Sequence, residues 1–146
     1  MFRSSVCSFL LLLINAWLAH AQDTATWPQW RGPTRDGMAA ASTNWPETLQ
    51  GNALEKLWRV ELGPSYSGPL VTADKVYVTE TLNKKTETVR ALDRKTGKII
   101  WTREWPGAMT VPFFARANGD WIRSTPTLDG DALYVAGMRD VLVCLD

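Results

Sequence analysis

Few residues of this chain have side chains that act as nucleophiles, bases or metal ligands. The only histidine is His20, and the only cysteines are Cys7 and Cys144. His20 and Cys7 lie within residues 1–21, which show a basic residue, a short apolar core and a small-x-small end, the pattern of a secretory signal peptide. The mature chain then has no imidazole and one thiol, which excludes histidine-based triads, histidine metal sites and an internal disulfide. We expect Cys144 to be a small buried strand residue.

Export is therefore the first expectation. The apolar core is about a dozen residues long, shorter than the roughly 20 needed to span a bilayer, so a signal peptide is favoured over a membrane anchor. We expect no transmembrane segment in the mature chain and a location in the periplasm, the cell envelope or the medium. Without Arg3, fifteen Lys and Arg balance fifteen Asp and Glu. This balance gives no reason to expect nucleic acid as a partner.

The sharpest local motif is ALDRKTGKIIW, from Ala91 to Trp101. Asp93 and Thr96 carry short oxygen-bearing side chains that can accept hydrogen bonds from turn amides, and Gly97 supplies a positive φ. Asp93 as a general base is an alternative, but turn carboxylates mostly cap backbone amides. Ala91 leaves room for a large neighbour, and we expect Trp101, from the same sheet or the next, to pack over it.

The elements around this motif are strands. Residues 22–53 are rich in Trp and Pro and show no periodicity, which indicates an irregular arm whose indoles pack against the body of the fold, with ligand stacking as the alternative. From residue 54 onward apolar and polar residues alternate, as in KLWRVEL, and tight turns at 73–75 and 93–97 separate successive strands. This pattern predicts an antiparallel meander.

The meander repeats along the chain. GPLVTADKVYV at 68–78 aligns with TPTLDGDALYV at 125–135, and VRALD at 89–93 aligns with the final LVCLD. Four antiparallel strands repeated at this spacing are typical of β-propeller blades, and an immunoglobulin-like sandwich has no reason to repeat in this way. We therefore predict an all-β fold: a piece of a β-propeller of four-stranded antiparallel blades, cut within its second blade at Asp146.

The motif also resembles a known family. Its residues match the Ala-x-Asp-x-x-Thr-Gly-x-x-x-Trp docking motif of the PQQ-like (pyrroloquinoline-quinone-type) propeller repeats, and WPQWRGPTRDG looks like the opening of secreted bacterial PQQ-binding-like proteins. The resemblance implies a ring of about seven or eight blades, in which LEKLWRVEL closes the ring as the outer strand of the last blade. The predicted divisions are a signal peptide at 1–21, an irregular arm at 22–53, a closing strand at 54–63, a blade at 66–105 and a partial blade at 123–146. The last three form the incomplete propeller domain, residues 54–146.

Two functions follow from the resemblance. The first is a non-catalytic binding or protein-interaction scaffold, in which the remaining blades of a longer chain complete the ring and exposed strands recruit a protein partner. The alternative is a quinoprotein dehydrogenase that uses pyrroloquinoline quinone and Ca²⁺, with its catalytic residues in further blades. We expect the scaffold, and we assign no catalytic or metal-binding residue and no definite cofactor.

A ligand site in such a ring would use the loops that lead into the inner strands, here Gly63 to Ser67 and Pro106 to Arg123. The second loop is long, and long structured loops tend to be functional. Arg123 could pair with an anionic group, with Trp121 or Tyr66 as a stacking face. Phe113 and Phe114 would either line a pocket or fill a gap between blades.

Overall fold

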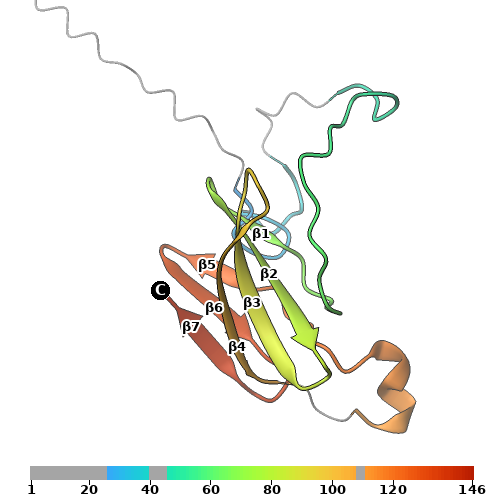
Figure 1. The fold of residues 1–146 in the computed structure, drawn as a ribbon, viewed down its shortest axis with the longest axis vertical. Coiled ribbons are helices and arrows are strands. Elements are labelled where there is room, and N and C mark those ends of the chain that lie inside the picture. Colours follow the sequence, from blue (N-terminus) through green and yellow to red (C-terminus); the bar gives the residue numbers. More distant parts are fainter. Residues whose placement is uncertain (1–25, 40–45, 108–110) are drawn as a thin grey trace, which may run out of the picture.

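A computed structural model describes residues 26–39, 46–107 and 111–146. The proposed signal peptide and Trp45 lie outside these residues. The described chain forms a four-stranded and a three-stranded antiparallel sheet, each with its strands in chain order, and no closed ring (Figure 1). The strands are β1 Leu70–Val71, β2 Lys75–Leu82, β3 Thr86–Asp93, β4 Ile99–Pro106, β5 Thr127–Asp129, β6 Ala132–Ala136 and β7 Leu142–Leu145, with one 3-10 helix, η1, at Phe113–Asn118.

The predicted meander is confirmed in both copies. β1 pairs with β2, β2 with β3 and β3 with β4, while β5, β6 and β7 repeat the first three of these positions. Tyr77 pairs with Leu70 in the first sheet, and Tyr134 pairs with Thr127 in the second. The aligned tyrosines therefore hold equivalent places in the two sheets.

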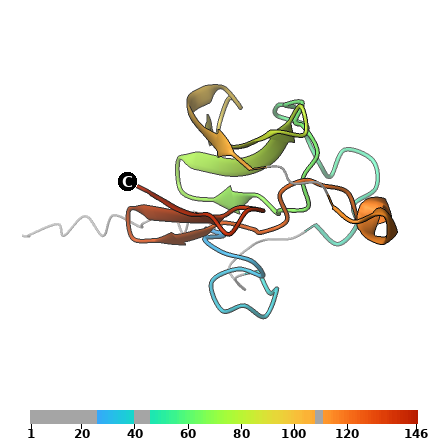
Figure 2. The same cartoon turned by 90° about the horizontal axis from the view of Figure 1, so that it is seen from below.

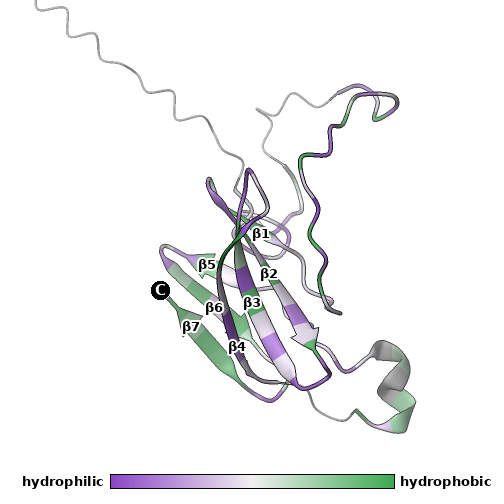
Figure 3. Ribbon diagram, viewed as in Figure 1, coloured by the Kyte–Doolittle hydropathy of each residue, from purple (hydrophilic) through white to green (hydrophobic). Residues whose placement is uncertain are grey.

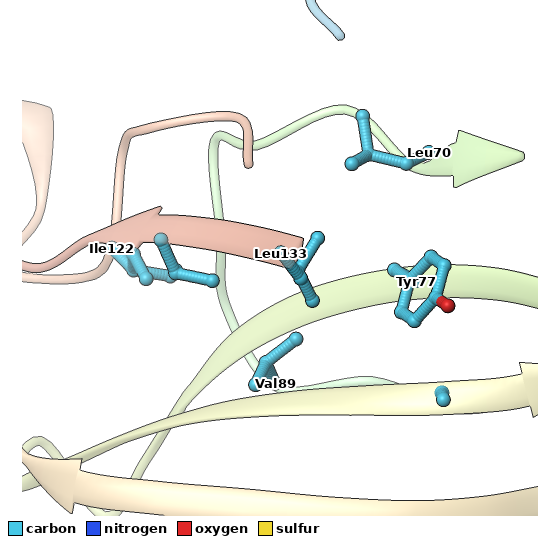
Figure 4. Close-up of a cluster of buried hydrophobic side chains, with 7 residues drawn as sticks. Leu70, Tyr77, Val89, Ile122 and Leu133 are labelled. Carbon is cyan, nitrogen blue, oxygen red and sulfur yellow. The ribbon is translucent and has the colours of Figure 1, made fainter. Parts of the chain in front are cut away.

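The two sheets pack face to face around one apolar cluster (Figure 4). Its buried members come from both sheets and from the loop between them: Leu70, Tyr77, Val89, Ala91, Ile122, Leu133 and Val135. Successive residues of a strand point to opposite faces, so the alternation in β2 and β3 sends Tyr77, Val89 and Ala91 toward the second sheet. This core fixes the positions of the loops that lead into β1 and β5.

Residues 54–63 cover the opposite face of the first sheet. Trp58 and Val60 pack against Val76, Val78 and Leu92, which are the β2 and β3 residues that point away from the second sheet. The segment is not part of a sheet, because no described strand lies beside it to accept its backbone hydrogen bonds. The closing strand expected here stays a prediction, but its apolar side faces the sheet as the alternation requires.

Within the described part of the arm, Trp27 and Pro28 make backbone hydrogen bonds to the sheets. Trp27 forms an isolated antiparallel bridge with Val71 of β1 and is half-buried. Trp30, expected to pack against the fold, is 65% exposed, because it lies in a surface turn that the Gly32 N–H closes on the Gln29 carbonyl. The blue loop of residues 29–39 projects away from both sheets (Figure 2).

The second sheet leaves its far face open. Cys144 lies in β7 as expected, but it is exposed rather than buried. Its strand neighbours on that face, Tyr134 and Leu142, are 39% and 72% exposed. Figure 3 shows that β6 and β7 are largely hydrophobic. The alternation correctly predicted a strand, but the layer that would bury this face is not among the described residues.

Candidate functional site

The candidate site is built around Ile122, which ties the second loop to the first sheet. Its side chain is fully buried in the core between the sheets. Its backbone N–H donates to Thr81 Oγ1 at 2.8 Å, and its carbonyl accepts from the backbone N–H of Tyr66 at 3.0 Å. Neighbouring residues of an extended chain point to opposite sides, so Trp121 and Arg123 point away from the core while Tyr66 is held beside them.

The structure brings the three predicted ligand-site residues together. The rings of Tyr66 and Trp121 have centroids 5.6 Å apart and are tilted by 40°. The Arg123 guanidinium lies over the Tyr66 ring at 5.6 Å from its centroid, and its Nη2 donates to the Gly119 carbonyl at 2.8 Å. The guanidinium is thus stacked and anchored at a fixed position, which favours recognition of planar groups.

Beside this stack lies a hollow of about 320 Å³. Tyr66 and Arg123 line it together with Ser124, Thr125 and Trp30 of the arm. Trp121 is not part of the lining and supports Tyr66 instead. The lining offers two aromatic faces, two hydroxyl groups and a guanidinium, a combination that can hold a flat ligand with acceptor groups at its edge.

Two further residues are important to this site, and one of them was missed from the sequence. Trp30 was expected to pack against the fold, with ligand stacking as the alternative, because nothing in the pattern separates a stacking indole from a buried one. Gly119 has φ +69°, and a Cβ there would collide with the Trp121 ring. Only glycine therefore lets the loop turn back so that Trp121 lies against it, and the sole signal was its place in a long loop.

Phe113 and Phe114 do not line the hollow. They are 81% and 76% exposed and form an edge-to-face pair on η1, with ring centroids 5.6 Å apart. They fill no gap between the two described sheets, because η1 projects from the end of the sheets (Figure 1). Two adjacent exposed phenylalanines on a structured loop are unusual on a surface without a partner.

The turn of the docking motif has a complete set of hydrogen bonds. Asp93 Oδ1 accepts from the backbone N–H and the hydroxyl of Thr96, both at 2.8 Å, and from the backbone N–H of Lys95 at 3.1 Å. Gly97 has φ +70°, and its N–H donates to the Asp93 carbonyl at 2.8 Å. The Thr96 hydrogen bonds hold the pKa of Asp93 below its usual value, which suits a capping carboxylate and not a base.

Trp58 docks on this turn. Its indole Nε1 donates to the Arg94 carbonyl at 2.8 Å, and a Cβ on Gly97 would lie 2.7 Å from the indole ring. Trp101, the motif's own tryptophan, instead lies opposite Ala91 and 5.9 Å from Tyr77 between ring centroids. The turn of one repeat therefore receives the tryptophan of the preceding segment, while its own tryptophan faces the second sheet.

Glu87 is a buried carboxylate that links the two sheets. It lies in β3, is fully buried, and accepts a hydrogen bond from Trp105 Nε1 at 2.9 Å. Its Oε1 also accepts from the backbone N–H of Met138, in the β6–β7 turn, at 2.9 Å. Gly137 gives this carboxylate its space, because a Cβ there would collide with it. A buried hydrogen bond of this kind fixes the position of one sheet against the other.

The side chains that line the hollow suit a planar organic group and not a metal ion. The lining residues include no carboxylate, and no group of three or more acidic, histidine or cysteine residues that could hold a metal occurs in the part of the chain that the structure describes. These residues fit the planar edge of a quinone but not its Ca²⁺ ion, which requires oxygen ligands of carboxylate or amide type.

Comparison with known proteins agrees with the repeat. Residues 85–146 match the family model described as outer membrane protein assembly factor BamB. The match covers β3 to the end of β7 and supports the resemblance to the PQQ-like repeat family. A search of curated proteins finds no match. Within the described residues, no helix has the length and apolar character needed to cross a membrane.

Proposed function

We propose that residues 54–146 are part of an exported PQQ-like β-propeller that acts as a non-catalytic binding scaffold in the cell envelope. The docking of Trp58 on the 93–97 turn carries the architectural part of this proposal. In a ring, each blade receives a tryptophan from the blade before it, and Trp58 supplies that contact to the first blade from a segment that precedes it in the chain. Residues 54–63 would then pair with the last blade.

The other side of the first blade supports the same arrangement. Trp101 borders a hollow of about 420 Å³ together with Leu145 and Asp146. Asp146 aligns with Asp93, so the turn that follows it in a continuing repeat would meet Trp101 there, as the first turn meets Trp58. The remaining blades would come from a longer chain, which would also cover the exposed face of β6 and β7.

The exposed Phe113–Phe114 pair carries the proposal of a binding scaffold. Burying an exposed aromatic pair removes unfavourable contact between apolar surface and water, so the pair suits a partner with apolar side chains along an extended strand. The matched family's name describes an assembly factor for outer membrane proteins. Outer membrane strands alternate apolar and polar residues, and we infer that segments of this kind are the partners.

The test is peptide binding by the full exported protein. Synthetic peptides with the alternating pattern of outer membrane strands, followed by fluorescence anisotropy, should bind saturably. The double variant Phe113→Ser/Phe114→Ser should weaken binding about tenfold or more, which corresponds to roughly 1.4 kcal/mol. The variant Ile99→Ser/Ile100→Ser, which changes two exposed apolar residues on β4, is the matched control. Equal affinity for all three proteins would refute the assignment of the phenylalanine pair.

One observation favours the quinoprotein alternative: Tyr66, Trp121 and Arg123 meet beside a hollow. Pyrroloquinoline quinone with Ca²⁺ should then quench tryptophan fluorescence saturably, and Arg123→Ala should abolish the quenching. Reduction of a redox dye with an alcohol or aldose substrate would establish an enzyme. The scaffold proposal expects no dye reduction.

A further inference from the structure

The first residues of the arm are hydrogen-bonded to both sheets at once. The N–H of Trp27 donates to the Val71 carbonyl at 2.7 Å, and the Val71 N–H donates back to the Trp27 carbonyl at 3.0 Å. The next residue, Pro28, accepts from the N–H of Leu128 in β5 at 2.8 Å. β1 and β5 are the first strands of their sheets, and the arm contacts the edge that each leaves unpaired by its own sheet. Trp27 and Pro28 thus bridge the free edges of β1 and β5.

The direction of the arm follows from this pairing. The Trp27–Val71 bridge is antiparallel, so residues after Trp27 run toward the start of β1. Trp30 accordingly lies near Gly68 and Thr125, with which it lines a second hollow of about 450 Å³. Trp30 also borders the hollow of Tyr66 and Arg123. The arm therefore runs beside β1 and β5, the inner strands of the two blades, and places Trp30 at the candidate site.

The local sequence makes residues 26–39 a folded unit. Pro28 has no N–H and holds Trp27 extended, which suits a short edge pairing. Gly32 has φ +80°, and a Cβ there would lie 2.8 Å from the Trp27 ring. The Gly37 N–H donates to the Arg31 carbonyl at 2.9 Å and closes the loop that projects from the sheets. These internal hydrogen bonds give residues 26–39 a defined conformation.

We propose that residues 26–39 lie along the axis of the ring, between the inner strands, and close its central channel. This inference rests on the proposed propeller, because inner strands surround the axis only when the blades form a ring. The paired inner edges are then unavailable to other strands. Trp30 forms the inner wall of the Tyr66–Arg123 hollow, so a ligand enters that hollow from the loop side alone.

The experiment compares the full exported protein with its Trp27→Ala variant. Hydrogen exchange at the Val71 and Leu128 amides reports the pairing of the arm, and trypsin cleavage after Arg31 reports its shielding. Trp27→Ala should speed exchange at both amides and cleavage after Arg31 by about tenfold or more, because losing most of a half-buried indole exceeds roughly 1.4 kcal/mol. The Val89 amide of the core should keep its protection in both proteins.

The matched control is Trp30→Ala, which removes an exposed indole from the same arm and should leave both amides unchanged. Unchanged exchange at Val71 and Leu128 in Trp27→Ala would overturn the proposal, as would rapid cleavage after Arg31 in the wild-type protein. Electron micrographs of the same sample distinguish a failure of the proposed propeller from a failure of the proposed axial position. Images without rings refute the propeller, whereas rings combined with rapid cleavage after Arg31 refute only the axial position.

Discussion

Replacing Gly97 with alanine measures what the docked indole contributes. Gly97 has φ +70°, and the new Cβ would lie 2.7 Å from two atoms of the Trp58 ring. The left-handed backbone costs an alanine about 1–2 kcal/mol. Displacing the indole adds about 1 kcal/mol for its hydrogen bond to the Arg94 carbonyl and about 1 kcal/mol for lost packing. The free energy of unfolding should therefore fall by about 3–4 kcal/mol.

Gly130 provides the matched control for this substitution. It also has a positive φ, +58°, but no atom lies within 4 Å of an added Cβ. Gly130→Ala should cost only the backbone term, about 1–2 kcal/mol. Urea unfolding followed by circular dichroism gives both values, and adding Trp58→Ala to each variant completes a double-mutant cycle. Equal losses for Gly97→Ala and Gly130→Ala would refute the docking of Trp58 as a source of stability.

Two further predictions concern buried and capping carboxylates. Glu87→Ala leaves the Trp105 indole N–H and the Met138 backbone N–H without an acceptor, so it should lower the free energy of unfolding by about 3 kcal/mol. Glu87→Gln should lower it by about half as much. Thermal unfolding checks both values, and an unchanged stability of Glu87→Ala would contradict the link between the sheets. The pKa of Asp93 is lowered in the folded state by Thr96, so its stabilising effect is present above pH 3.8 and is lost as the pH falls through the lower folded value. A carboxyl titration by NMR should show this lowered pKa, and Thr96→Val should bring it back toward its usual value.

The repeat made most of the fold predictable. Alternation and turn residues located the strands on both sides of Gly97, and the internal alignment located β5, β6 and β7. Tyr66 and Arg123 were brought together by an argument about loops, which needs only the chain order of the strands. Such features depend on neighbours in sequence or on repetition, and both are visible in a single chain.

Contacts between residues far apart in the sequence could not be predicted from these local patterns. Glu87 looks like an ordinary polar residue in an alternating strand, and its burial arises from the Met138 turn, 51 residues away. Trp30 and Cys144 were both expected to be covered, because apolar residue type does not tell which layer lies above a side chain. Pairing of residues 54–63 likewise depends on a neighbour that the local pattern cannot identify.

The central claim is that residues 54–63 belong to a neighbouring blade and place Trp58 on the first turn. Hydrogen exchange of the backbone amides of residues 56–62 in the full exported protein tests it most directly. As an outer strand of a closed ring, these amides should show alternating strong protection, since one edge of the strand is paired. Uniform exchange at the rate of an unfolded chain, with the core amides of β3 still protected, would contradict the account.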